Sequence, residues 1–199
     1  MVWPGRPLSA VVGGRAARGE PPAAAARPLW PAVAAVVLAA AACTPALDWR
    51  EARLDGGTLT ALFPCKPVEL SREATLLDRQ VRMTLQSCAA DDTTFAVSHA
   101  DVGDPARVAP ALAQMQSALA ANLGAAPLGR TPFRVAGMTP GEQAARLRLR
   151  GSLPGGAGAV EEEAVFFARG TRVYQAVVLG RWAGAEAADT FFGSLRLPT

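Results

Sequence analysis

Two neighbouring segments near the end of the chain constrain its fold most strongly. Glu161–Arg169 and Arg172–Gly180 flank the turn residues Gly170 and Thr171, a pattern that predicts a β-hairpin. Both segments contain consecutive apolar residues, which are Val165, Phe166 and Phe167 in the first and Ala176, Val177, Val178 and Leu179 in the second. Because successive side chains of a strand point to opposite faces, these runs predict a sheet that is covered on both faces.

Further strands are expected where apolar and polar residues alternate or where turn residues flank a short apolar segment. These strands are Trp49–Arg53, Thr58–Phe63, Gln80–Cys88, Thr93–Ala100, Phe133–Ala136 and Gln143–Arg150, with Ser194–Leu197 as a candidate last edge strand. In Gln80–Cys88 the side chains that share the apolar face are those of Val81, Met83 and Leu85. In Thr93–Ala100 they are those of Phe95, Val97 and His99. These two strands are expected to form a second hairpin.

One long helix is predicted between these strands. Asp104 is a suitable N-cap, Pro105 suits the first helical position, and Gly124 is placed to end the helix. The apolar residues Val108, Leu112, Met115 and Leu119 recur at helical spacing. The helix is therefore expected over residues Pro105–Leu123, and a short second helix over Ala185–Phe192.

The order of these elements is strands, helix, strands, helix, without regular βαβ alternation. Such an order favours an α+β fold. We expect an antiparallel sheet of about six or seven strands flanked by the long and the short helix.

The first 42 residues do not resemble part of a folded domain. A basic segment is followed by the apolar run Leu29–Ala42, which ends at Cys43, and this is the pattern of a secretory signal. Fourteen helical residues extend only about 21 Å, whereas the hydrocarbon core of a bilayer is about 30 Å thick. We therefore expect a signal peptide over residues 1–42, a tether over 43–47 and one domain over 48–199.

The end of the apolar run resembles the lipobox of bacterial lipoproteins. The three small residues Ala40, Ala41 and Ala42 precede Cys43. The resemblance implies cleavage before Cys43 and acylation of its thiol. In that family a residue other than Asp after the Cys directs the lipoprotein to the outer membrane, so Thr44 at this position implies an outer-membrane lipoprotein facing the periplasm. An ordinary secretory signal or an uncleaved anchor is the alternative.

The net charge of +3 belongs to this leader. Four basic residues and one acid precede Cys43, which leaves sixteen charges of each sign in the rest of the chain. A neutral domain without a cluster of basic and aromatic residues does not favour nucleic-acid binding.

The three cysteines suggest a disulfide. If Cys43 carries lipid, Cys65 and Cys88 remain as a pair in an oxidising compartment. Two free buried thiols are the alternative. The spacing of the cysteines does not match a zinc site.

Few residues are available for acid–base chemistry, since the chain has one His (His99), one Lys and one Tyr. His99 follows Ser98 directly in a strand, so the two side chains point to opposite faces and cannot form a catalytic pair. No catalytic residue, metal site or cofactor is therefore predicted, although four acids could in principle meet and bind a cation: Asp91, Asp92, Asp101 and Asp104.

Two further groups allow a structural and a functional interpretation. The acids Glu161–Glu163 are expected to face Arg148 and Arg150 across a strand pair, or else the stripe Arg146, Arg148 and Arg150 could serve an anionic partner. Trp49 is expected to pack under the sheet, or else to lie near a membrane surface.

Three segments carry a second resemblance. They are Asp55-Gly56-Gly57 with Phe63-Pro64-Cys65-Lys66-Pro67, Gly170–Val177, and Phe191–Leu197. In their order and spacing they resemble the Mog1/PsbP-like superfamily, whose fold is an antiparallel sheet between helices and whose members are mostly non-enzymatic binding or assembly factors.

The resemblances together imply a lipid-anchored envelope protein that binds a protein partner or aids assembly. One alternative is a carrier or sensor of a small apolar ligand, bound between the sheet and helix Pro105–Leu123. The other is an envelope hydrolase.

Overall fold

The structure is a computed structural model that describes residues 47–155, 158–180 and 185–198. These residues form an α+β fold with a seven-stranded antiparallel sheet in the order β3-β4-β5-β9-β8-β7-β6. A separate antiparallel pair consists of β1 and β2. The predicted fold class is confirmed.

The strands of the seven-stranded sheet are β3 (Val68–Leu76), β4 (Arg79–Ala90), β5 (Thr93–Asp101), β6 (Pro127–Pro132), β7 (Ala145–Gly151), β8 (Val160–Arg169) and β9 (Arg172–Gly180). The small sheet consists of β1 (Arg50–Leu54) and β2 (Leu59–Phe63), joined by the single helical turn η1 (Asp55–Gly57). The helices are α1 (Pro105–Asn122) and α2 (Ala185–Gly193).

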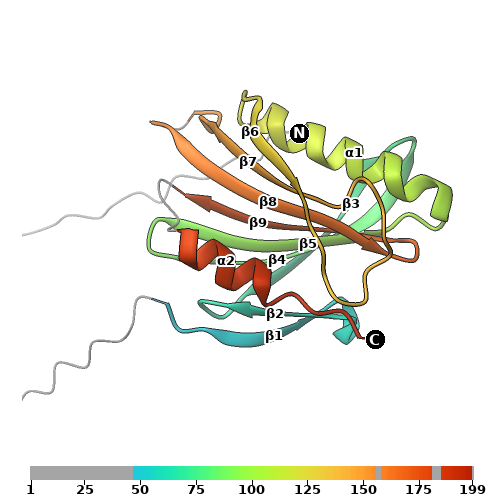
Figure 1. The fold of residues 1–199 in the computed structure, drawn as a ribbon, viewed down its shortest axis with the longest axis horizontal. Coiled ribbons are helices and arrows are strands. Elements are labelled where there is room, and N and C mark those ends of the chain that lie inside the picture. Colours follow the sequence, from blue (N-terminus) through green and yellow to red (C-terminus); the bar gives the residue numbers. More distant parts are fainter. Residues whose placement is uncertain (1–46, 156–157, 181–184, 199) are drawn as a thin grey trace, which may run out of the picture. The chain divides into compact units, whose positions relative to one another are not determined.

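Both faces of the large sheet are covered, as the two apolar runs of β8 and β9 require (Figure 1). Helix α1 packs on one face, where Leu112, Met115 and Leu119 meet Phe166 and other side chains of the sheet. Helix α2 and the β1–β2 pair pack on the other face. The hairpin β8–β9 therefore contributes side chains to two separate cores.

The core on the face of α2 is rich in aromatic residues. Phe95 and Phe191 lie edge to face with their ring centroids 5.4 Å apart, and Phe167 stacks on Tyr174 at 5.0 Å. Trp49 packs against this core, 5.9 Å from Phe95. Trp49 therefore packs under the sheet, which is the first of its two predicted interpretations.

The predicted helix ends are found almost unchanged. The Asp104 side chain accepts a hydrogen bond from the backbone N–H of Ala106 at 2.8 Å, as an N-cap does. At the other end Gly124 has a φ of 58°, a conformation that glycine adopts without strain. The second helix extends one residue beyond its predicted end.

Strands β3 and β6 were not predicted from the sequence, and one predicted strand is wrong. Strand β3 is an edge strand whose side chains are exposed except for Ala74 and Leu76, so it has little apolar alternation. Strand β6 carries a proline at each end. The segment Phe133–Ala136, predicted as a strand, is irregular: Phe133 and Val135 pack into the core, and the Phe133 N–H donates to the carbonyl of Ala144, but the segment forms no strand.

The candidate edge strand at Ser194–Leu197 is reduced to one bridge. Arg196 exchanges two backbone hydrogen bonds with Thr60 of β2, at 2.9 and 3.0 Å. The end of the chain thus returns to the small sheet and does not extend the large one (Figure 1).

The start of the loop after β7 approaches the end of α1 closely. The backbone N–H of Ser152 donates to the carbonyl of Leu123 at 3.2 Å. A Cβ atom on Gly151 would lie 2.3 Å from that carbonyl oxygen. Only glycine can occupy this position without displacing the end of the helix.

Candidate functional site

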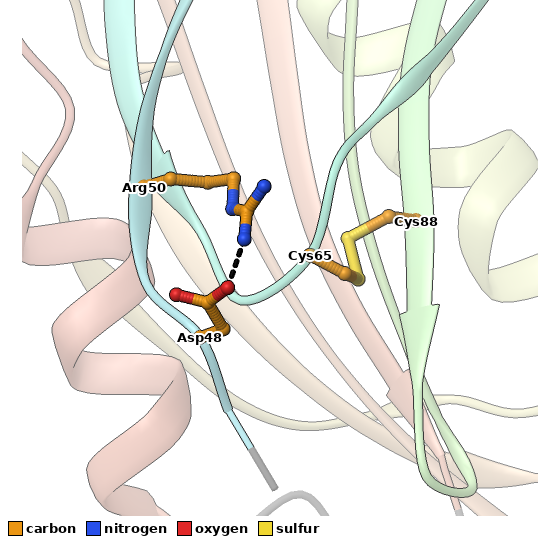
Figure 2. The surroundings of a disulfide bond; sticks show 4 residues. All are labelled: Asp48, Arg50, Cys65 and Cys88. Carbon is orange, nitrogen blue, oxygen red and sulfur yellow. Dashed lines mark hydrogen bonds and ion pairs between the residues drawn. A yellow bond between two sulfur atoms is a disulfide. The ribbon is translucent and has the colours of Figure 1, made fainter. Parts of the chain in front are cut away.

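A disulfide fixes the chain between the two sheets. Cys65 lies in the connection from β2 to β3, and its sulfur is bonded to that of Cys88 on β4, with the Cα atoms 5.9 Å apart (Figure 2). The expected pair is thus present, and Cys88 packs against the core on the face of α2. Cys43, the expected lipidation site, lies outside the described residues.

The residues just before β1 are held beside this disulfide. The backbone N–H of Asp48 donates to the carbonyl of Pro64 at 3.0 Å, one residue before Cys65. The Asp48 carboxylate also pairs with Arg50, as Figure 2 shows. Any tether that precedes residue 48 therefore joins the domain at a point that the disulfide braces.

A buried carboxylate joins the turn η1 to the large sheet. The side chain of Asp55 is only 5% exposed and lies between three residues of β5 and β9. It accepts a hydrogen bond from the Tyr174 hydroxyl at 2.7 Å and pairs with the Arg172 guanidinium. The third neighbour is His99, whose Nδ1 lies 3.5 Å from the Asp55 carboxylate.

This cluster has an ionic and a neutral part. Burial lowers the pKa of His99, although Glu69 acts in the opposite direction, so the imidazole is neutral at pH 7. Burial also raises the pKa of Tyr174 and keeps its hydroxyl protonated as a donor. The charge of Asp55 is therefore balanced mainly by Arg172.

His99 lies on the face predicted from the sequence, whereas the contact with its neighbour Asp55 was not predicted. His99 shares a face with Phe95 and Val97, whereas Ser98 is buried on the opposite face of the sheet. The Nε2 atom of His99 is buried without a hydrogen-bond partner among the described residues. A His–carboxylate contact is thus present, but no hydroxyl or thiol in the described part of the chain is bonded to the imidazole. The arrangement binds the turn to the sheet.

A second site lies beside α1. A pocket of about 310 Å³ opens between the first half of the helix, the loop over residues 139–144 and the turn between β8 and β9. Its wall contains Val108, Ala109 and Leu112 from the helix and Ala144 and Ala168 from the opposite side. Pockets for small molecules have volumes of ~300–1,000 Å³ and mostly apolar walls, so this pocket can hold a small apolar group.

The charged cleft beside β7 is internally paired. It has a volume of about 580 Å³. Arg146 binds both Glu163 and Asp189, and its guanidinium lies 5.1 Å from the ring centre of Phe192. Arg148 pairs with the same Glu163 at 3.1 Å. The register places Arg148 opposite Glu163 and Arg150 opposite Glu161, as predicted. Glu163 forms ion pairs with both Arg146 and Arg148.

Glu162 departs from this pairing. It is 6% exposed and faces α1, opposite Leu149 and Leu179 of the neighbouring strands. Burial raises the pKa of its carboxyl to about 7. The prediction that all three acids are solvated partners of arginine is wrong for Glu162, because alternate residues of a strand face opposite sides.

The acids considered for a cation are far apart. Asp91 and Asp92 precede β5, whereas Asp101 is its last residue and Asp104 follows it, so the length of the strand separates the two pairs. Within the described ranges, no three His, Cys, Asp or Glu residues are placed to hold a metal ion. In the same part of the chain, no helix has the length and apolar character that crossing a membrane requires.

No model of a protein family matches the chain, and no curated protein matches it.

Proposed function

We propose that the chain is a lipid-anchored, non-enzymatic protein of the bacterial cell envelope, which binds a protein partner or aids an assembly process. The leader supports the anchor, since its apolar run ends in three alanines and Cys43. The resemblance to the Mog1/PsbP-like superfamily supports the binding role, and the fold of a sheet between helices agrees with that resemblance.

The observation that carries this proposal is the disulfide between Cys65 and Cys88. Stable disulfides form in secreted and periplasmic proteins, whereas the bacterial cytosol keeps thiols reduced. Of the three cysteines in the sequence, the bond leaves Cys43 as the remaining thiol, at the position that the lipobox resemblance gives to the acyl chain.

The anchor is tested by blocking lipoprotein signal peptidase in cells that express the full chain. The expected result is a larger precursor, and a Cys43→Ser variant is expected to leave the membrane fraction. A Cys65→Ser/Cys88→Ser variant is the control, since it lacks the disulfide but keeps Cys43. An unchanged size and location of the Cys43→Ser protein would contradict the proposal.

The partner is tested by chemical cross-linking in intact cells, followed by purification of the full chain from solubilised membranes. One protein that recurs in replicate samples, and is missing when the Cys43→Ser variant is used, is the expected result. Repeated recovery of the chain alone would count against the binding role.

The pocket beside α1 favours a second candidate function, the carriage of a small apolar ligand. Ala109 is exposed and lines the pocket, so Ala109→Trp fills it without entering the core. Native mass spectrometry of the purified protein is expected to show a bound small molecule that this variant loses. Ala118→Trp, at an exposed position of the same helix outside the pocket, is the matched control. A spectrum of the unmodified protein without bound mass would exclude this function.

A further inference from the structure

The two edges of the seven-stranded sheet are built differently. Strand β6, at one edge, begins with Pro127 and ends with Pro132, and its register with β7 shifts at Leu128. Proline has no N–H to donate, and a register shift interrupts the row of hydrogen-bonding groups. These features protect β6 against the addition of another strand.

Strand β3, at the opposite edge, has no such protection. Its nine residues contain no proline, and they pair with β4 without interruption from Val68 opposite Ser87 to Leu76 opposite Arg79. Within the described residues no strand pairs with its outer side. The strand therefore presents a regular row of backbone donors and acceptors to a further strand.

The same edge exposes apolar side chains. Val68 is 72% and Leu70 45% exposed, and both lie on the face that α1 partly covers. The helix lies beside the other end of β3, where the Gln114 side chain accepts a hydrogen bond from the Leu77 N–H, and it leaves Val68 and Leu70 exposed. An open backbone row beside exposed apolar side chains is the arrangement that binds an added strand.

The charged residues of β3 favour one register for its antiparallel pairing with β3 of a second copy of the chain. When Leu70 lies opposite Leu70 of an antiparallel second copy, Val68 lies opposite Arg72 and Glu69 opposite Ser71. No like charges then face each other, and both exposed apolar residues are covered. Directly opposed like charges destabilise a strand pair, whereas apolar pairs stabilise it.

The neighbouring registers fail this test. Pairing centred on Ser71 places Glu69 opposite Glu73 twice, and pairing centred on Arg72 opposes that residue to itself. Centring the pair on either glutamate opposes two carboxylates. Among the registers centred between Glu69 and Glu73, only the one centred on Leu70 avoids every like-charge pair.

We propose that β3 is a self-association edge, through which two copies of this chain form an antiparallel strand pair with Leu70 on the two-fold axis. The pair joins two seven-stranded sheets into one. Five residues of each strand, Val68 to Arg72, take part, so the contact is smaller than a standard interface of ~1,600 Å². The dimer is therefore concentration-dependent, and its formation does not depend on the proposed anchor.

The test is disulfide cross-linking of the full chain with single introduced cysteines. Leu70→Cys places two thiols directly opposite each other, with Cβ atoms ~5 Å apart. Val68→Cys and Arg72→Cys serve as matched controls on the same face, because each lies ~13 Å from its own copy in the second chain. The parent chain reports the background from its own cysteines.

The expected result is about tenfold more cross-linked dimer for Leu70→Cys than for either control alone, since only Leu70 lies opposite itself in this register. A mixture of the Val68→Cys and Arg72→Cys chains is expected to cross-link to each other, because these residues face one another. Equal cross-linking of all variants, or a Leu70→Cys yield at the parent's level, would overturn the proposal. So would a Leu70→Cys product that contains a different protein.

Discussion

The Tyr174 hydroxyl donates a hydrogen bond of 2.7 Å to Asp55, a residue 119 positions earlier in the chain. Tyr174 is fully buried in the central strand of the large sheet, and Asp55 begins the turn of the small one. This bond, together with the ion pair to Arg172, fixes the small sheet on the large one. These polar contacts add to the apolar contacts that hold the two sheets together.

Replacing Asp55 tests this connection. Asp55→Asn removes the charge but keeps a side chain that tolerates the residue's φ of 52°. The loss of a charged acceptor for Tyr174 and Arg172 is expected to lower the free energy of unfolding by about 2 kcal/mol, measured by urea denaturation. Asp91→Asn is the matched control, since Asp91 has a φ of 51° in an exposed turn. Equal effects of the two substitutions would mean that the contacts of Asp55 contribute nothing.

Removing the disulfide is expected to lower the free energy of unfolding by about 3 kcal/mol, because the bond closes a loop between residues 23 positions apart. The variant is Cys65→Ser/Cys88→Ser, and the measurement is urea denaturation with and without a reducing agent. The reductant is expected to destabilise the parent protein and to leave the variant unchanged. If the parent were insensitive to the reductant, the bond would not contribute to stability.

Glu162 makes the stability depend on pH. The pKa of its carboxyl is about 7 in the folded protein, against an ordinary value of 4.5. Below pH 4.5 the Glu162 carboxyl is protonated in both the folded and the unfolded protein, so its burial does not lower the free energy of unfolding through this titration. As the pH rises from 4.5 to 7 the unfolded state releases its proton first, so stability falls, and above pH 7 the full cost of about 3 kcal/mol is present.

The substitution Glu162→Gln is therefore expected to stabilise the protein at pH 8 and to have little effect at pH 4. Denaturation at the two pH values measures the difference. Glu161→Gln, one residue earlier on the opposite face, is the control. A gain from Glu162→Gln that is the same at both pH values would show that the carboxyl does not titrate as described.

Gly151→Ala tests the close approach of β7 to the end of α1. A Cβ atom there would lie 2.3 Å from the Leu123 carbonyl oxygen, so the backbone must move. The expected loss of stability is about 2 kcal/mol, which is typical of overpacking, and thermal denaturation measures it. Gly129→Ala in β6, where an added Cβ meets no atom within 4 Å, is expected to be neutral.

The sequence predicted those parts of the fold whose apolar pattern is complete. The strands β8 and β9 are apolar on both faces, and α1 has a cap at each end, so local residues determine them. Strand β3 could not be recognised in the same way, because an edge strand buries few side chains. Its position results from pairing with β4, which the residues of β3 alone do not encode.

The polar contacts were harder to predict than the fold. The pairing of Cys65 with Cys88 followed from a count of cysteines, without knowledge of their distance. The contact between Asp55 and His99 joins the turn η1 to strand β5, 44 positions later in the chain, and the sequence around Asp55 indicates only a turn. Only the register of β5 and β9 brings Tyr174 beside His99, and with it the carboxylate of Asp55.

The position of β9 in the sheet has a consequence for the time at which the domain can form. Strands β3, β4 and β5 form one three-stranded meander, and β6, β7 and β8 form another. Strand β9 lies between the two meanders and pairs with β5 and β8. Of these seven strands, the ribosome synthesises β9 last. A nascent chain that ends at Arg169 has both meanders but nothing to join them, so the domain closes only when the final segment is available.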